Sequence, residues 1–145
     1  MIIRQATQKD EEDCVAMSMS FMQMTPYNKH PLDYGSLAIM FRNAVDSKLA
    51  FVAEIEELVI GMIIGVRVPA FFNNSIVIAQ EFGWWVDEEY RHTHAGVALH
   101  KAFEEASSDC KIVSMSLLST SPPQLHGYLK SIGYNEAEMA YFKEN

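Results

Sequence analysis

Apolar residues along this chain follow two periods, and the longer period predicts helices. Apolar positions spaced by about 3.6 residues predict helices over about Leu32–Asp46 and Ala95–Ser107. An earlier helix over about Asp10–Met22 is expected because the hydroxyl of Thr7 can cap an acidic first turn. A shorter helix is expected near the end of the chain, over about Gln124–Ile132.

Runs rich in apolar, β-branched and aromatic residues predict strands between these helices. Leu49–Ile55 and Leu58–Val68 are separated by the acidic turn Glu56-Glu57, so they should form an antiparallel hairpin. Gly133 is a natural residue for ending the last helix before a final strand. The other strands are expected near Ile2-Ile3 and over Ile76–Val86, Lys111–Leu118 and Tyr134–Phe142.

The resulting order of elements is β-α-α-β-β-β-α-β-α-β. A hairpin run followed by a β-α-β crossover predicts an α/β fold, with a mixed sheet of the α+β kind and helices on both of its faces. The crossover joins Ile76–Val86 through the helix Ala95–Ser107 to Lys111–Leu118. A phosphate group is best held there, because the N-terminus of a helix meets the carboxyl end of a strand.

Length and charge narrow the functional classes. The chain has 145 residues, of which 49% are hydrophobic, and this composition predicts a single folded domain over residues 1–145. Its 19 acidic and 11 basic residues give a net charge of −8, and the basic residues are scattered. Nucleic acid is therefore not an expected partner, because such binding needs a basic face.

Cysteine and histidine usage gives no sign of a disulfide framework or a metal site. Cys14 and Cys110 have neither redox nor metal-binding spacing. Among the five histidines only His92 and His94 lie close together, and no cysteine or carboxylate is a convincing further ligand for them. The N-terminus has no apolar signal segment, and the longest apolar run, Leu58–Val68, is too short to span a bilayer. A cytoplasmic protein without a membrane anchor is expected.

The loop between the strand ending at Val86 and the helix starting at Ala95 carries the most specific signal. It resembles the acyl-CoA motif of the GNAT acetyltransferase superfamily, Q/R-x-x-G-x-G/A, with Arg91 at the first position and Gly96 at the last. His94 stands where the family has glycine. The motif suits a pyrophosphate because successive amides and a helix N-terminus point toward it, while small residues let the backbone approach closely.

The resemblance implies an acetyl-CoA site built mainly from backbone atoms. The amides of residues 92–96 would hold the pyrophosphate, and the backbone of Trp84 and Val86 would pair with the pantetheine arm as an added strand does. Trp84 and Trp85 should point to opposite faces of the sheet, so one of them is expected to pack in the core. The implied cofactor-binding residues are Trp84, Trp85, Val86, Arg91, His92, Thr93, His94, Ala95 and Gly96.

A general base is implied on the strand that precedes this loop. Glu81 lies three residues before Trp84, in a segment where relatives place a carboxylate that removes the proton of the attacking amine. A partly apolar cleft can raise the pKa of such a carboxyl group toward neutral pH. A slip of one residue in the strand register would put Gln80 in its place.

A general acid is implied in the last helix. Many relatives place a tyrosine four residues before the terminal glycine, where it protonates the leaving thiolate, and in this chain that position is Leu129. Tyr128 is one residue away and His126 is three, so Tyr128 is the expected acid. Water is an alternative, because a CoA thiolate is a tolerable leaving group.

Together these features predict an acetyl-CoA-dependent N-acetyltransferase in which a primary amine attacks the thioester directly in a ternary complex. Neither cysteine has a base nearby in the sequence, which argues against an acyl-enzyme intermediate. The acidic chain favours a cationic acceptor, which is either a small molecule such as a polyamine or an amino sugar, or a protein lysine. Met22, Met24 and Tyr27 lie where relatives build the acceptor cleft, and Phe71-Phe72 suits an interface or a substrate wall.

Two further readings stay open on the sequence alone. The glycine position filled by His94 and the acid position filled by Leu129 favour the alternative of a catalytically weak binding module, which would hold a protein partner or sense acyl-CoA. The resemblance is also compatible with a homodimer.

Overall fold

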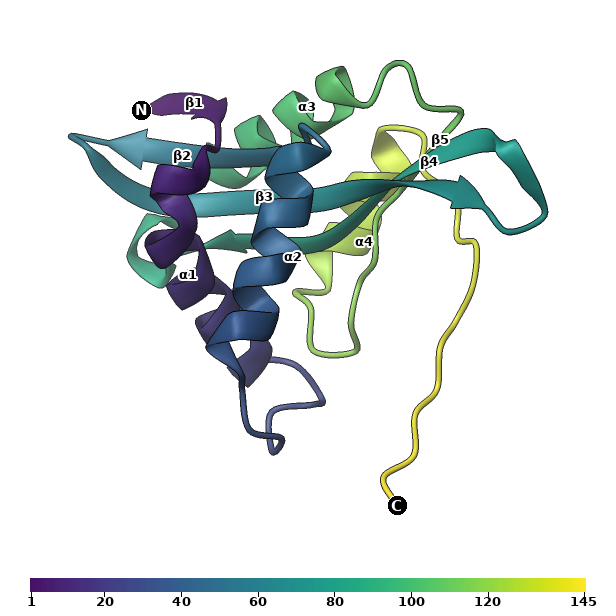
Figure 1. Cartoon of the computed structure of the whole chain (residues 1–145), viewed down its shortest axis with the longest axis horizontal. Coiled ribbons are helices and arrows are strands. Elements are labelled where there is room, and N and C mark those ends of the chain that lie inside the picture. Colours follow the sequence, from purple (N-terminus) through teal and green to yellow (C-terminus); the bar gives the residue numbers. More distant parts are fainter.

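The computed structural model describes all of residues 1–145 and contains one five-stranded sheet in the order β1-β2-β3-β4-β5 (Figure 1). The first four strands are antiparallel neighbours, and β5 runs parallel to β4, which confirms the predicted mixed sheet. The strands are β1 (Ile2–Gln5), β2 (Ala50–Ile55), β3 (Leu58–Ala70), β4 (Asn73–Val86) and β5 (Ile112–Ser114). The helices are α1 (Glu11–Gln23), α2 (Tyr34–Asp46), α3 (Ala95–Ala106) and α4 (Gln124–Ser131), with short 3-10 turns at Gln8–Asp10 and Glu88–Tyr90.

Helices cover both faces of the sheet because side chains on its central strands alternate between two apolar clusters. On one face, Met62 of β3 packs with Phe41, and α1 and α2 lie side by side across this face (Figure 1). On the other face, Ile63 packs with Leu99 and Phe103 of α3. None of the helices is long and apolar enough to cross a lipid bilayer.

The predicted cap, hairpin turn and helix end are all present in the structure. The Thr7 hydroxyl accepts a hydrogen bond from the amide of Lys9, as expected of a capping residue. The β2–β3 turn places Glu56 and Glu57 at φ 48° and 67°, the left-handed pair that a two-residue hairpin turn requires. Gly133 ends α4 at φ 103°, which a residue with a Cβ adopts only under strain.

The end of the chain differs from the predicted final strand over Tyr134–Phe142. Residues 134–145 form no strand, and β5 pairs over only three residues where Lys111–Leu118 was expected. A strand beyond β5 would have little ladder to join, because β5 pairs over only three residues, and Met139 and Tyr141 are exposed. The last residues instead reach the α1–α2 connection, where Phe142 packs against Tyr27 and Glu144 pairs with His30.

A β-bulge in β4 decides which side chains share a face. The register of β3 against β4 shifts between Ile64, which faces Gly83, and Gly65, which faces Glu81, so Phe82 is the additional residue. A Cβ on Gly65 would lie 2.5 Å from the carbonyl oxygen of Gln80, so only glycine fits at this point.

The bulge brings Glu81 to the α3 side of the sheet together with Trp84. Ala79 and Trp84 both join the cluster on the α3 face, while Phe82 packs against the opposite cluster. Glu81 lies two residues after Ala79 and therefore shares its face. In a strand without a bulge, the three-residue offset would have put Glu81 and Trp84 on opposite faces.

Candidate functional site

The parallel ladder between β4 and β5 stops after three rungs, and this leaves one edge of β4 without a strand partner. The last paired residues are Gln80 and Ser114. Beyond them, a side chain replaces the next backbone hydrogen bond between the strands. Oε2 of Glu81 accepts a hydrogen bond of 3.2 Å from the amide of Ser116. From Glu81 to Val86, β4 pairs only with β3.

Backbone groups of Trp84 and Val86 face this unpaired edge. The amide of Asp87 donates to the carbonyl of Ile60 across the β3–β4 ladder at 2.9 Å, and hydrogen-bonded pairs alternate in an antiparallel ladder. Trp84 and Val86 are therefore the residues whose amides and carbonyls point away from β3. The edge has the direction and spacing that an extended ligand arm needs for strand-like pairing.

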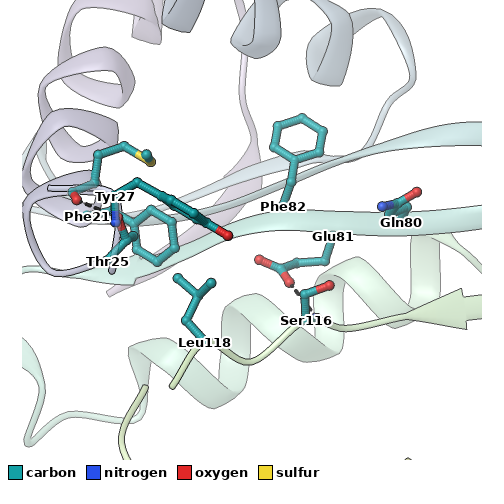
Figure 2. Close-up of a pocket in the computed structure, with 9 residues that line it drawn as sticks. Phe21, Thr25, Tyr27, Gln80, Glu81, Phe82, Ser116 and Leu118 are labelled. Carbon is teal, nitrogen blue, oxygen red and sulfur yellow. Dashed lines mark hydrogen bonds between the residues drawn. The ribbon is translucent and has the colours of Figure 1, made fainter. Parts of the chain in front are cut away.

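A cavity of about 220 Å³ lies beside Glu81 at the start of this edge (Figure 2). Its apolar walls come from three separate parts of the chain, namely Phe21, Met22 and Tyr27 at the end of α1 and after it, Phe82 of β4, and Leu118 after β5. Its polar lining residues are Thr25, Gln80, Glu81 and Ser116. Figure 2 shows Glu81 and Phe82 on opposite sides of β4 and the Tyr27 hydroxyl directed toward Glu81 from the other wall.

Glu81 is a buried carboxyl group without a cationic partner. Its exposed fraction is 4%, and burial raises its pKa to about 8, while the hydrogen bond from the Ser116 amide acts in the opposite direction. A carboxyl group with such a pKa can accept and release a proton near neutral pH. Gln80, the alternative from a register slip, also lines the cavity but has no acid–base chemistry.

Other residues expected near the acceptor are divided between the cavity and the surface. Met22 and Tyr27 line the cavity, whereas Met24 is exposed and lies outside its lining. Phe71 and Phe72 pack edge to face at the β3–β4 turn, where Phe71 is 99% exposed, and neither lines the cavity.

The loop after β4 presents free amides at the start of α3. Thr93 uses its amide to bond the carbonyl of Tyr90, and the amide of Ala95 bonds the hydroxyl of Thr93. The amides of His92, His94 and Gly96 have no acceptor within the chain. His94 is the N-cap residue of α3, and its exposed imidazole makes no capping hydrogen bond.

Arg91 lies beside this loop with its side chain turned back to β4. Its guanidinium lies 4.5 Å from the ring centre of Trp85, and its Nε donates to the carbonyl of Val86 at 2.9 Å. The carbonyl of Val86, expected to meet a pantetheine arm, is therefore occupied by an exposed side chain. The fold has room for a Cβ at Gly96, since that atom would lie 3.8 Å from the nearest side-chain atoms of Trp84 and Val86.

The two tryptophans point to opposite faces of the sheet. Trp84 lies on the α3 face, where its Nε1 donates to the carbonyl of Gly96 at 3.2 Å and its ring stacks on His100. Trp85 lies on the other face, against the edge of Phe21, and donates to Asp87. Trp84 therefore fixes the first turn of α3 against the open edge, and Trp85 packs beneath α1.

A hydrogen-bonded chain connects Tyr128 to α3. The Tyr128 hydroxyl lies 3.1 Å from Nδ1 of the fully buried His100, whose Nε2 lies 3.3 Å from the Tyr134 hydroxyl. Tyr134 donates its hydrogen to Glu104, because a carboxylate only accepts. Nε2 of His100 must then donate to Tyr134, and its Nδ1 accepts from Tyr128. Burial lowers the pKa of His100 and raises that of Tyr128, which favours the neutral form of both.

The rotation of α4 about its axis gives the residues at the three candidate acid positions different environments. Leu129 is buried in the core, His126 is exposed, and Tyr128 is half-buried with its ring near Trp84.

Sequence reasoning missed His100, although the sequence contained a signal. His100 lies three residues before Phe103 on the apolar stripe of its helix, and a histidine at such a position needs polar partners.

The remaining reactive residues do not form a second site. Cys14 is buried beneath α2, and burial raises the pKa of its thiol, so it is a poor nucleophile. Cys110 lies beside Arg67 and outside the cavity lining. No group of three or more histidine, cysteine, aspartate or glutamate residues is arranged to hold a metal ion.

Solved structures share this fold over nearly the whole chain, although sequence comparison finds neither a matching family model nor a matching curated protein. Ribosomal-protein-alanine N-acetyltransferase from Brucella melitensis biovar Abortus 2308 matches with a TM-score of 0.72 and 13% identity over 100% of both chains. A transcriptional regulator from Bacillus halodurans C-125 matches with a TM-score of 0.75 and 18% identity over 99% of both. AAC(6′)-Iy, solved with the bisubstrate analogue CoA-S-monomethyl-acetylneamine, matches with a TM-score of 0.72 and 16% identity over 99% of this chain and 97% of its own. The chain therefore has the fold of the GNAT acetyltransferases, as its loop motif and its order of elements up to the last helix predicted.

Proposed function

We propose that the protein is an N-acetyltransferase that moves an acetyl group from acetyl-CoA to a primary amine in a ternary complex. The observation that carries the proposal is the buried Glu81, which lies in a cavity at the point where β4 loses its strand partner. A structural neighbour binds a CoA-containing bisubstrate analogue, and another is an N-acetyltransferase, which supports the same chemistry for this fold.

Acetyl-CoA fits the unpaired edge of β4 and the loop that follows it. The free amides of His92, His94 and Gly96, at the positive end of the α3 dipole, would bind the pyrophosphate. The backbone of Trp84 would pair with the pantetheine arm, which directs the thioester toward Glu81. Arg91 is exposed, so its guanidinium can leave the carbonyl of Val86 for a phosphate oxygen.

Glu81 would act as the general base for the attacking amine. The ionised carboxylate takes the proton that the amine nitrogen loses as it attacks the thioester carbonyl carbon and forms the C–N bond. An acceptor that arrives as an ammonium ion first gives up one further proton to solvent. As the carbonyl re-forms, the C–S bond breaks and the sulfur leaves as a thiolate. Tyr128 would give its proton to this thiolate, and the proton that Glu81 has taken restores the phenol through solvent.

Calorimetry and thiol release together test this proposal. Acetyl-CoA should bind in the micromolar range, and a primary amine should then release CoA thiol. Glu81→Gln should retain CoA affinity and lower kcat about a hundredfold or more, because it keeps the shape of the side chain but removes its basicity. The exposed Glu105→Gln is the matched control and should behave as wild type.

Absence of CoA binding would overturn the proposal. Binding without thiol release from any amine would indicate the alternative of an acyl-CoA-sensing module, and an unchanged rate in Glu81→Gln would exclude Glu81 as the base.

A further inference from the structure

The chemistry of the cavity walls beside Glu81 narrows the class of acceptor. We infer that the acceptor is a compact monoamine with an apolar body of about the size of one aromatic ring, rather than a polycation or a polypeptide. This inference rests on the proposed acetyltransfer and deepens it. It replaces the polyamine, amino sugar or protein lysine that the net charge of the chain suggested with an acceptor that carries one charge.

The apolar walls surround the position that the body of an acceptor would occupy. Phe21 and Tyr27 form the wall at the C-terminal end of α1, Phe82 comes from the bulge in β4, and Leu118 lines the side that follows β5 (Figure 2). An apolar body gains binding free energy by covering these side chains, whereas hydroxyl groups placed against the same walls would be left without partners.

The cavity offers a charged partner to one ammonium group but not to several. Glu81 is the only charged residue of the lining. The hydroxyl of Thr25 is already used, because it donates to the carbonyl of Met22 at 2.7 Å and accepts from the amide of Tyr27. A second ammonium group in the cavity would find no carboxylate, and an unpaired buried charge strongly opposes binding.

The last residues of the chain pack against Tyr27, which forms part of the cavity wall. The ring of Phe142 packs against Tyr27 at 5.1 Å between centroids, and Glu144 accepts from His30 with an N–O distance of 3.0 Å. These contacts place residues 142–144 beside the α1–α2 connection, next to a cavity of about 220 Å³. A small molecule fits this space, whereas an extended polypeptide would need the tail to move.

A panel of acceptors that differ in charge and body tests the inference. Thiol release with saturating acetyl-CoA should give phenethylamine a kcat/KM at least about tenfold above that of spermidine, an aminoglycoside and a lysine-containing peptide. An equal or higher kcat/KM for any of these three competitors would overturn the inference.

Leu118→Asp adds a carboxylate to the wall and tests the charge argument within the same fold. This variant should raise the spermidine-to-phenethylamine ratio of kcat/KM at least about tenfold, whereas the uncharged control Leu118→Asn should lower the rate for phenethylamine without favouring spermidine. Equal ratios in the two variants would contradict the account of the cavity.

Binding of amines to the CoA-loaded protein separates this inference from the proposed reaction. If no amine reacts, acetyltransfer fails, but the acceptor class is still decided by NMR. Chemical-shift changes at Tyr27 and Phe82 with phenethylamine, and none with spermidine, would support the inference. Changes with spermidine alone, or with neither amine, would overturn it.

Discussion

The two ends of the unpaired β4 edge are built in different ways. At the Glu81 end, side chains from α1, β4 and the segment after β5 surround one buried carboxyl group. At the α3 end, the groups available to a ligand are backbone amides without an acceptor in the chain. Backbone amides suit a substrate that does not vary, such as CoA, whereas side chains can adapt a cavity to one acceptor. Changes at the first end should therefore alter rate and acceptor choice, and changes at the second should alter CoA affinity.

Tyr128→Phe should have a large effect on rate and little effect on CoA affinity. Loss of the proton donor to the leaving thiolate should lower kcat about tenfold to a hundredfold, because general acids contribute on this scale. Nitrogen NMR should show His100 as the neutral tautomer protonated at Nε2 in wild type. Tyr134→Phe is the control, since it removes the acceptor at Nε2 but keeps Tyr128, and its kcat should fall less. Equal rates for wild type and Tyr128→Phe would leave water as the acid.

Gly96→Val should affect the other end of the edge. A branched side chain would cover the amides at the start of α3 and raise the Kd for CoA about tenfold, while the order of preference among acceptors stays the same. Gly96→Ala adds only a Cβ, which has room in the fold, and should bind CoA more tightly than Gly96→Val. Calorimetry measures both values. If Gly96→Val instead changed the acceptor preference and left the Kd for CoA unchanged, the two ends of the β4 edge would not have the separate roles described above.

His94→Gly should have the smallest effect of these changes. The imidazole is exposed and makes no capping bond, so the backbone amide remains available when the side chain is removed. The Kd for CoA should change by no more than about twofold, as for most surface substitutions. A Kd at least tenfold weaker in the same calorimetric titration would show that the imidazole itself contacts phosphate.

The α3 end of the edge could be predicted from sequence because its parts are contiguous. Arg91–Gly96 follow one strand and begin one helix, so a short motif contains the whole arrangement. The use of Arg91 could not be predicted, since its contact with the carbonyl of Val86 depends on how its side chain folds back over Trp85.

The Glu81 end could be predicted only in part. Glu81 itself was a candidate, but its cavity is completed by Phe21, Tyr27 and Leu118, which are distant in sequence and meet only through the tertiary fold. The face that Glu81 occupies depends on the bulge at Phe82. The bulge shifts the alternation by one residue, but Trp84, Trp85 and Val86 after it are all apolar, so the pattern does not reveal the shift. The predicted final strand was wrong because a strand needs a partner edge, which composition does not reveal.

The pH dependence of the reaction tests the role of Glu81 most directly. The experiment uses a fluorinated phenethylamine whose own pKa lies below the range scanned, so that only the enzyme titrates. Burial raises the pKa of Glu81 to about 8, and a base must be ionised, so kcat/KM should rise with pH through about 8 in wild type. Glu81→Gln should show a low rate without this rise. A flat profile in wild type, or the same rise in Glu81→Gln, would contradict the account.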